Sequence, residues 1–355
     1  MSSTAANLTG VIPSYMLAQL AQSGRFPRAA AAARQTLIAG RPQYHSTLEL
    51  SIDEDGSLVA EVTAAPTRTI YDAQNTETLP GLIVRAEDDP PVADASVNEA
   101  FDGLGATFRL LIEAFERDSL DGAGAPLHAT VHYGEDYDNA FWDGSRMVFG
   151  DGDGEVFRGF TLSVSVIGHE LGHGVIQSAS GLEYQGQSGA LNESVADVLG
   201  VLTEQHLLGQ TAADATWLVG EGIFTDAVQG RALRSMIEPG TAYDDDELGK
   251  DPQPGHMRDY VETVEDNGGV HINSGIPNRA FALAATTLGG PAWERAGLAW
   301  YRALTSGISP RSTFIEFAEA TLAAAADLGD DVEAAVAAAW REVGVFDDDR
   351  TRSPR

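Results

Sequence analysis

Apolar residues recur along the chain with two different periods. Residues 46–64 alternate apolar and polar side chains around an acidic turn, which predicts a β-hairpin. Residues 97–118 instead place apolar side chains three or four positions apart, which indicates a helix. Short apolar runs predict further strands at 82–85, 129–133 and 147–149. The region from 65 to 160 is therefore expected to be mixed and mostly β.

Helical periodicity dominates the second half of the chain. Helices are predicted at 163–177, 189–208, 278–287, 291–305, 313–328 and 331–343. The last three carry aromatic and leucine residues on one face, which is typical of core packing. The pattern predicts an α+β protein with two lobes, the first rich in strands and the second helical. A cleft between the lobes is the expected place for a site.

The first 45 residues stand apart from this layout. Ile12 and Pro13 lead into a short helical stretch, and an alanine-rich stretch continues to about Ile38. The predicted division is a separate N-terminal segment (1–45), a β-rich lobe that includes the first helix of the C-terminal half (46–185), a helical lobe (186–347) and a tail (348–355). From the residues alone, the N-terminal segment is open to interpretation as a solvated arm.

Composition excludes several classes of protein. The 53 acidic and 22 basic residues give a formal net charge of −31, which argues against nucleic-acid binding. Apolar runs stay shorter than the roughly 18 residues that a membrane span needs. The chain has no cysteine, so any metal must be held by nitrogen and oxygen. The first 25 residues lack the pattern of a secretory signal peptide.

The pattern His-Glu-Leu-Gly-His at 169–173 is the strongest chemical signal. On a helix, His169 and His173 project from one face one turn apart, so both can bind one zinc ion. Glu193, twenty residues later on a second predicted helix, is the expected third ligand. Three protein ligands leave a position open for water, which is typical of a catalytic zinc site. Asp197, one turn beyond Glu193, can accept the second N–H of a ligating histidine.

The remaining residues of the pattern suit metal-assisted hydrolysis. Zinc lowers the pKa of bound water toward about 7 and polarises a carbonyl. Glu170, which is not a ligand, is the candidate general base. His271 and Tyr184 are candidates to stabilise an oxyanion, with Asp266 orienting His271 in a loop over 266–275.

On the basis of these residues, the chain resembles the thermolysin family of zinc metallopeptidases. The similarity spans roughly residues 66–345, and family motifs match in order at 138–142, 147–154, 169–173, 184–193, 232–236 and 266–275. The resemblance implies zinc ligands His169, His173 and Glu193, with Glu170 as the base. It also implies a neutral endopeptidase that cleaves peptides or proteins before bulky hydrophobic residues.

The resemblance assigns substrate contacts as well. Asn139 and Ala140 would hydrogen-bond the substrate backbone, and Arg234 would hold a substrate carbonyl just past the scissile bond. The apolar pocket for the residue after the cut corresponds to Phe157, Val166, Val219, Ile223 and Leu233.

The N-terminal segment resembles the short propeptide of protealysin-like members of that family. In that group a proline-containing segment blocks the cleft of the precursor. The resemblance implies that the segment is an intramolecular inhibitor and that Pro13 and Tyr15 lie in or near the active site.

The resemblance also bears on calcium binding. Two acidic residues that correspond to the paired calcium site of better-known members, Glu204 and Glu221, are present, but the other positions are Ser165, Thr216 and Leu218. We therefore expect the paired site to be lost and at most one weak calcium to bind.

The resemblance implies a secreted monomer. The lack of a visible signal peptide leaves a cytoplasmic location as the alternative.

Two other interpretations remain at this stage. A zinc-binding scaffold without activity would retain the ligands, but Glu170, Tyr184 and His271 serve chemistry rather than metal retention. A chain locked by its own N-terminal segment would act mainly by binding until processed.

Overall fold

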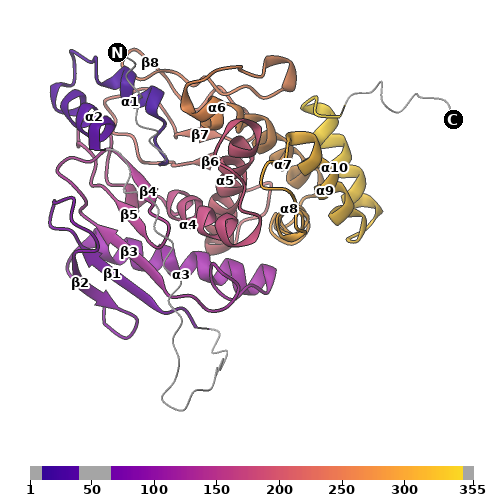
Figure 1. Ribbon diagram of the computed structural model, residues 1–355, viewed down its shortest axis with the longest axis horizontal. Coiled ribbons are helices and arrows are strands. Elements are labelled where there is room, and N and C mark those ends of the chain that lie inside the picture. The colour runs from indigo at the N-terminus through magenta and orange to yellow at the C-terminus, as the bar shows by residue number, and fades with distance from the viewer. Residues whose placement is uncertain (1–9, 40–64, 347–355) are drawn as a thin grey trace.

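The computed structural model describes residues 10–39 and 65–346, and its elements fall into a sheet-containing part and a helical part (Figure 1). The predicted hairpin at 46–64 and the predicted tail at 348–355 lie outside the described residues. The N-terminal segment forms α1 (Ser14–Leu20) and α2 (Pro27–Ala39), where two helical stretches were predicted.

The first part is built on one five-stranded sheet. Its strands are β1 (Arg68–Asp72), β2 (Leu82–Ala86), β3 (Leu127–Val131), β4 (Ala140–Trp142) and β5 (Met147–Phe149), in the order β2-β1-β3-β5-β4. The pairs β1–β3 and β3–β5 are parallel, whereas β1–β2 and β4–β5 are antiparallel. The short strand β4 therefore lies at an edge of the sheet with one side open to another extended segment.

One long helix accompanies the sheet. Helix α3 (Ala95–Phe115) begins with Asp94 as its N-cap, whose carboxylate accepts the Ser96 N–H, and it buries most of its apolar face. The strands at 82–85 and 147–149 and this helix confirm the predictions. The strand predicted at 129–133 begins two residues earlier, and because the strands are short, α3 is the longest element of a region predicted to be mostly β.

Two central helices carry the motif residues. Helix α4 (Val164–Ala179) follows the 3₁₀ turn η1 (Phe160–Leu162), and α5 (Gly186–Leu208) is buried along most of its length. The two helices approach closely because small residues face each other: a Cβ on Gly200 would lie 2.3 Å from the Ser165 carbonyl oxygen. This close approach brings the motif residues of the two helices close together.

The helical part completes the second half of the chain. After the short strands β6 (Leu218–Val219), β7 (Arg234–Ser235), β8 (Asp244–Asp245) and β9 (Gly249–Lys250) and the turn η2 (Met257–Asp259), the remaining elements are α6 (Asp266–Asn273), α7 (Gly275–Leu288), α8 (Ala296–Thr305), α9 (Phe314–Ala326) and α10 (Asp330–Glu342). Trp340 is fully buried, as predicted for the aromatic residues of these helices, and it stacks on Trp300 with ring centroids 5.7 Å apart. Within the described ranges, no helix is both long and apolar enough to cross a membrane.

One histidine outside the motif fastens the sheet to its surroundings. His132 directly follows β3; its Nδ1 lies 2.9 Å from Asp151 and its Nε2 2.9 Å from Asp94, the N-cap of α3. The hydrogen bond to Asp151 raises the pKa of His132, partial burial lowers it, and the hydrogen bond to Asp94 raises it again. The resulting pKa is about 9. The charged imidazolium thus connects the sheet, α3 and the loop at 150–154.

This pair of contacts predicts a pH-dependent contribution to stability. Because the folded pKa lies above the usual value of about 6.5, the contribution is complete below pH 6.5 and is lost as the pH rises through 9. The side chain is 19% exposed, so we expect His132→Gln to lower the free energy of unfolding by only about 1–2 kcal/mol at pH 5.5. Urea midpoints at pH 5.5 and pH 10 test this; equal differences at both pH values would contradict it.

Candidate active site

The two motif histidines and Glu193 converge between α4 and α5. His169 Nε2 and His173 Nε2 lie 3.2 Å apart. Glu193 Oε2 is 3.5 Å from His169 Nε2, and Oε1 is 3.6 Å from His173 Nε2. Three possible ligand atoms, two nitrogens and one carboxylate oxygen, lie within 4.8 Å of one another.

Acceptors behind the two histidines orient their rings. His169 Nδ1 lies 2.8 Å from Asp197 Oδ1, and His173 Nδ1 lies 2.8 Å from Asn192 Oδ1. Because both acceptors face Nδ1, each ring carries a proton there and turns Nε2 toward the point that the Glu193 carboxylate also faces. No sequence motif marks Asn192 for this role; the general need of a ligating histidine for an acceptor is the signal that points to it.

The donor set fits zinc. Zinc accepts imidazole nitrogen and carboxylate oxygen, and three protein ligands leave one position open. Burial raises the pKa of Glu193, but the facing His271, His169 and His173 together lower it to about 2, so the carboxylate is ready to bind a cation. Glu170 lies on α4 between the two histidines and is fully buried. A cavity of about 260 Å³ opens beside His173, with Tyr184, Trp142 and Leu182 in its lining.

His271 approaches the same place from the other side. The segment 266–275 was predicted to be a loop; its first residues do have non-helical backbone angles, but His271 lies in the helical part of α6. Residues Asn267, Gly268 and Gly269 there adopt positive φ angles, which gives the glycine-rich stretch a kink that sequence periodicity does not reveal. Asp266 accepts from both the ring and the backbone of His271, at 2.6 and 2.9 Å.

The electrostatic surroundings keep His271 charged. Burial lowers the pKa of His271, but Glu193 and Asp266 raise it to about 9. The Tyr184 hydroxyl lies 3.2 Å from His271 Nε2 and donates a short hydrogen bond to Glu193. Two donors, Tyr184 and His271, therefore stand beside the three possible metal ligands.

Arg234 links this cluster to the N-terminal segment. The guanidinium is 1% exposed and binds both carboxylate oxygens of Asp197, at 2.9 and 2.8 Å. Asn278 donates to the same carboxylate at 2.8 Å. Asp197 therefore holds His169 and Arg234 at once.

Residues 10–12 of the N-terminal segment lie against β4 and Arg234. Val11 N–H donates to the Ala140 carbonyl at 3.1 Å, and Arg234 Nη1 donates to the Val11 carbonyl at 3.0 Å. The Asn139 side chain exchanges hydrogen bonds with Ile12, at 2.9 and 3.2 Å. The Gly10 carbonyl oxygen lies 3.2 Å from His271 Nε2.

Pro13 and Tyr15, which were expected in or near the active site, come after residues 10–12 in the chain. Pro13 is buried and is the N-cap of α1. Tyr15, on α1, has its pKa raised by burial and then by Tyr243, Asp251 and Asp266. The expected pocket residues are buried in one continuous apolar cluster that also contains Val11 and Ile12: Phe157, Val166, Val219, Ile223 and Leu233.

Two family models and two known proteases are similar to this chain. A family model described as the thermolysin metallopeptidase catalytic domain matches residues 39–177, and the alpha-helical domain of the same family matches residues 180–345. An extracellular metalloprotease of Pectobacterium carotovorum subsp. carotovorum is 52% identical over 280 residues, which cover 78% of this chain and 81% of the relative. Protease PrtS of Photorhabdus sp. (strain Az29) is 53% identical over 282 residues, 78% of this chain and 76% of the relative.

A solved structure is similar over nearly the whole chain. The precursor of protealysin, a metalloproteinase from Serratia proteamaculans, aligns with a TM-score of 0.86 and 47% sequence identity. The alignment covers 96% of this chain and 100% of the other.

Proposed function

The chain belongs to the thermolysin family of metalloendopeptidases, and on that premise we propose that it cleaves peptide bonds before bulky hydrophobic residues. The observation that carries the proposal is the convergence of His169, His173 and Glu193 next to the buried Glu170. The zinc that this family uses supplies, when bound, Lewis-acid activation of water and of the scissile carbonyl.

The chain's own residues have distinct roles in this proposal. Glu170 takes a proton from the attacking water and delivers it to the leaving amine. His271 and Tyr184 donate hydrogen bonds to the carbonyl oxygen as it gains negative charge, and Asp266 holds His271 in place.

Substrate position is set by the edge of the sheet. A peptide bound beside β4 would use Asn139 and Ala140 for its backbone and Arg234 for the carbonyl after the scissile bond. The apolar cluster around Phe157, Val166 and Leu233 then receives the side chain of the residue after the cut, which favours bulky hydrophobic residues.

We also propose that the full-length chain is a self-inhibited precursor. Residues 10–12 use the same Asn139, Ala140 and Arg234 groups that a substrate needs, so the two cannot bind together. A chain that begins near residue 45 should cleave casein or a hydrophobic-site peptide at least about tenfold faster than the full chain, because an intramolecular inhibitor acts at a high effective concentration.

A metal chelator provides the control for that assay. Activity of the shortened chain should disappear with the chelator and return with zinc. Equal activity of the two chains would remove the precursor proposal, and activity that survives removal of zinc would remove the hydrolase proposal.

We propose that the paired calcium site of better-known relatives is lost. Burial, and then the negative charge of Glu221, raise the pKa of Glu204, and the cavity beside Glu204 holds only about 10 Å³ and is lined partly by Leu218. Calcium at about 10 µM should therefore leave the melting temperature unchanged, with any shift confined to about millimolar calcium. A shift of several degrees at micromolar calcium would contradict this.

We propose a secreted monomer as the form that acts, since the relatives named above include an extracellular metalloprotease. The cytoplasmic alternative predicts that the processed chain stays inside the cell. Mass spectrometry of the N-terminus from cells and from medium distinguishes the two.

A further inference from the structure

Two groups in the cleft mark one peptide bond of the N-terminal segment. His271, the proposed donor to the reacting carbonyl, contacts the Gly10 oxygen at 3.2 Å. Arg234, the proposed holder of the carbonyl just past the cut, contacts the Val11 oxygen at 3.0 Å. Both assignments place the Gly10–Val11 bond in the reacting position. We infer that Gly10–Val11 is a self-processing bond, an inference that rests on the function proposed above.

The backbone direction agrees with this assignment. Val11 N–H donates to Ala140, and Ile12 uses both its N–H and its carbonyl on Asn139. The segment thus runs along β4 with the polarity of a substrate whose residue after the cut is Val11. Val11 is apolar and fully buried, as the proposed specificity requires.

Close packing fixes the position of this bond. A Cβ on residue 10 would lie 2.6 Å from the Ala140 oxygen and 2.8 Å from Asn139 Oδ1. These distances are too short for any side chain, and the oxygen atoms belong to the same residues that hold Val11 and Ile12. Glycine at position 10 therefore allows the close approach, and a larger residue would displace the bond.

Cleavage here is a complete hydrolysis. Water adds its oxygen to the Gly10 carbonyl carbon, the C–N bond to Val11 breaks, and the Val11 nitrogen gains a proton through Glu170. The products are a carboxylate on Gly10 and an ammonium on Val11, and no other reactant is needed.

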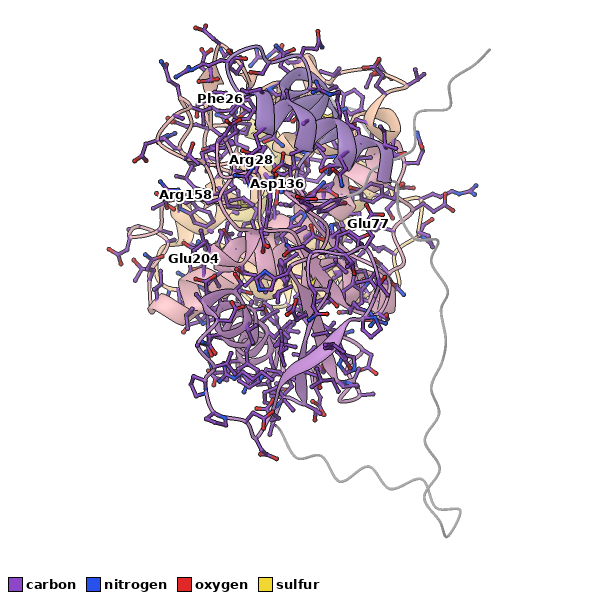
Figure 2. All side chains as sticks on the ribbon, turned by 90° about the vertical axis from the view of Figure 1, so that its left-hand side faces the viewer. Phe26, Arg28, Glu77, Asp136, Arg158 and Glu204 are labelled. Atoms are coloured by element: carbon purple, nitrogen blue, oxygen red, sulfur yellow. The ribbon has the colours of Figure 1, made fainter. Side chains whose placement is uncertain are left out.

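The trimmed segment stays docked after the cut. On α2, Arg28 forms an ion pair with Asp136, and Figure 2 shows the two residues side by side. Glu155 accepts the backbone N–H groups of Arg28 and Ala29, both at 3.0 Å, and so caps the helix N-terminus. Arg25 donates to the Ala227 carbonyl at 3.1 Å. Because these contacts lie beyond the cut, loss of residues 1–10 does not release the inhibitor.

The test is the intact mass of the zinc-loaded full chain over time. We expect loss of residues 1–10 at a rate that is unchanged by 100-fold dilution, since the bond lies in the cleft of its own chain. The trimmed product should remain inactive on an added peptide. Glu170→Gln should keep residues 1–10.

Two glycine variants provide a matched pair. Gly10→Ala should slow the cut about 100-fold, because a displacement of about 1 Å is enough to do so. Gly24→Ala should leave the rate unchanged, because a Cβ there meets no atom within 4 Å.

Hydrogen exchange gives a readout that does not depend on activity. In the zinc-free full chain, the amides of Val11 and Ile12 should exchange slowly, and Gly10→Ala but not Gly24→Ala should accelerate them. Equal exchange in both variants would overturn the placement.

The outcomes separate the two proposals. If the chain that begins near residue 45 cleaves an added peptide but the full chain keeps residues 1–10 or is cut first elsewhere, the self-processing inference fails and the function stands. If neither reaction occurs in zinc-replete protein, the function itself fails.

Discussion

Glu170→Gln in the chain that begins near residue 45 should lose peptide cleavage by a factor of about 10²–10⁴, the usual contribution of a general base. The amide has the shape of the carboxylate but cannot take the water's proton. His169, His173 and Glu193 are unchanged, so zinc should still bind with one ion per chain. The measurements are kcat/KM on a hydrophobic-site peptide and the zinc content of the same sample.

Glu319→Gln provides the control for that variant. Glu319 is exposed on α9, so the same chemical change there should leave both values as in the parent chain. Retained cleavage in Glu170→Gln with zinc bound would assign the base to another group.

Asp197→Asn should weaken both zinc binding and the fold. The carboxylate accepts from His169 and from two nitrogens of Arg234, all fully or almost fully buried. Loss of its charge leaves the Arg234 guanidinium buried without a counter-charge, which costs about 3–5 kcal/mol of the free energy of unfolding. The neutral amide is also a weaker acceptor behind His169 than the carboxylate, which lowers zinc affinity about 10–100-fold.

Urea midpoints and competition with a zinc chelator measure the two effects separately. Asp226→Asn is the matched control, because the Asp226 side chain is fully exposed and its ion pair with Arg158 contributes little. A stability change in Asp197→Asn no larger than that of Asp226→Asn would show that Arg234 does not depend on Asp197.

The central part of the site was predictable because its geometry is local. The spacing of His169 and His173 fixes their common face on any helix, and Asp197 follows Glu193 by one turn for the same reason. The structure places these four side chains together between α4 and α5. The long periodic segments also predicted the ends of most helices to within a few residues of the observed bounds. An exception is α8, which begins at Ala296 rather than at 291.

The features that were missed depend on contacts between distant segments. His271 lies in the helical part of α6, but Asn267, Gly268 and Gly269 before it have positive φ, so local propensity predicts a loop for the whole segment. The strands β1 and β4 were missed because β4 has three residues and β1 has no strict alternation, so both depend on their partners in the sheet. Asn192 gains its role only when α5 meets α4.

The presence and ligands of zinc in the processed chain test the account most directly. Anomalous diffraction at the zinc edge, from crystals of the chain that begins near residue 45, should show one ion per chain. We expect it within about 2.0–2.2 Å of His169 Nε2, His173 Nε2 and a Glu193 oxygen, with no fourth side chain bound. A fourth protein ligand that closes the site, or no zinc peak there under zinc-replete conditions, would contradict the account.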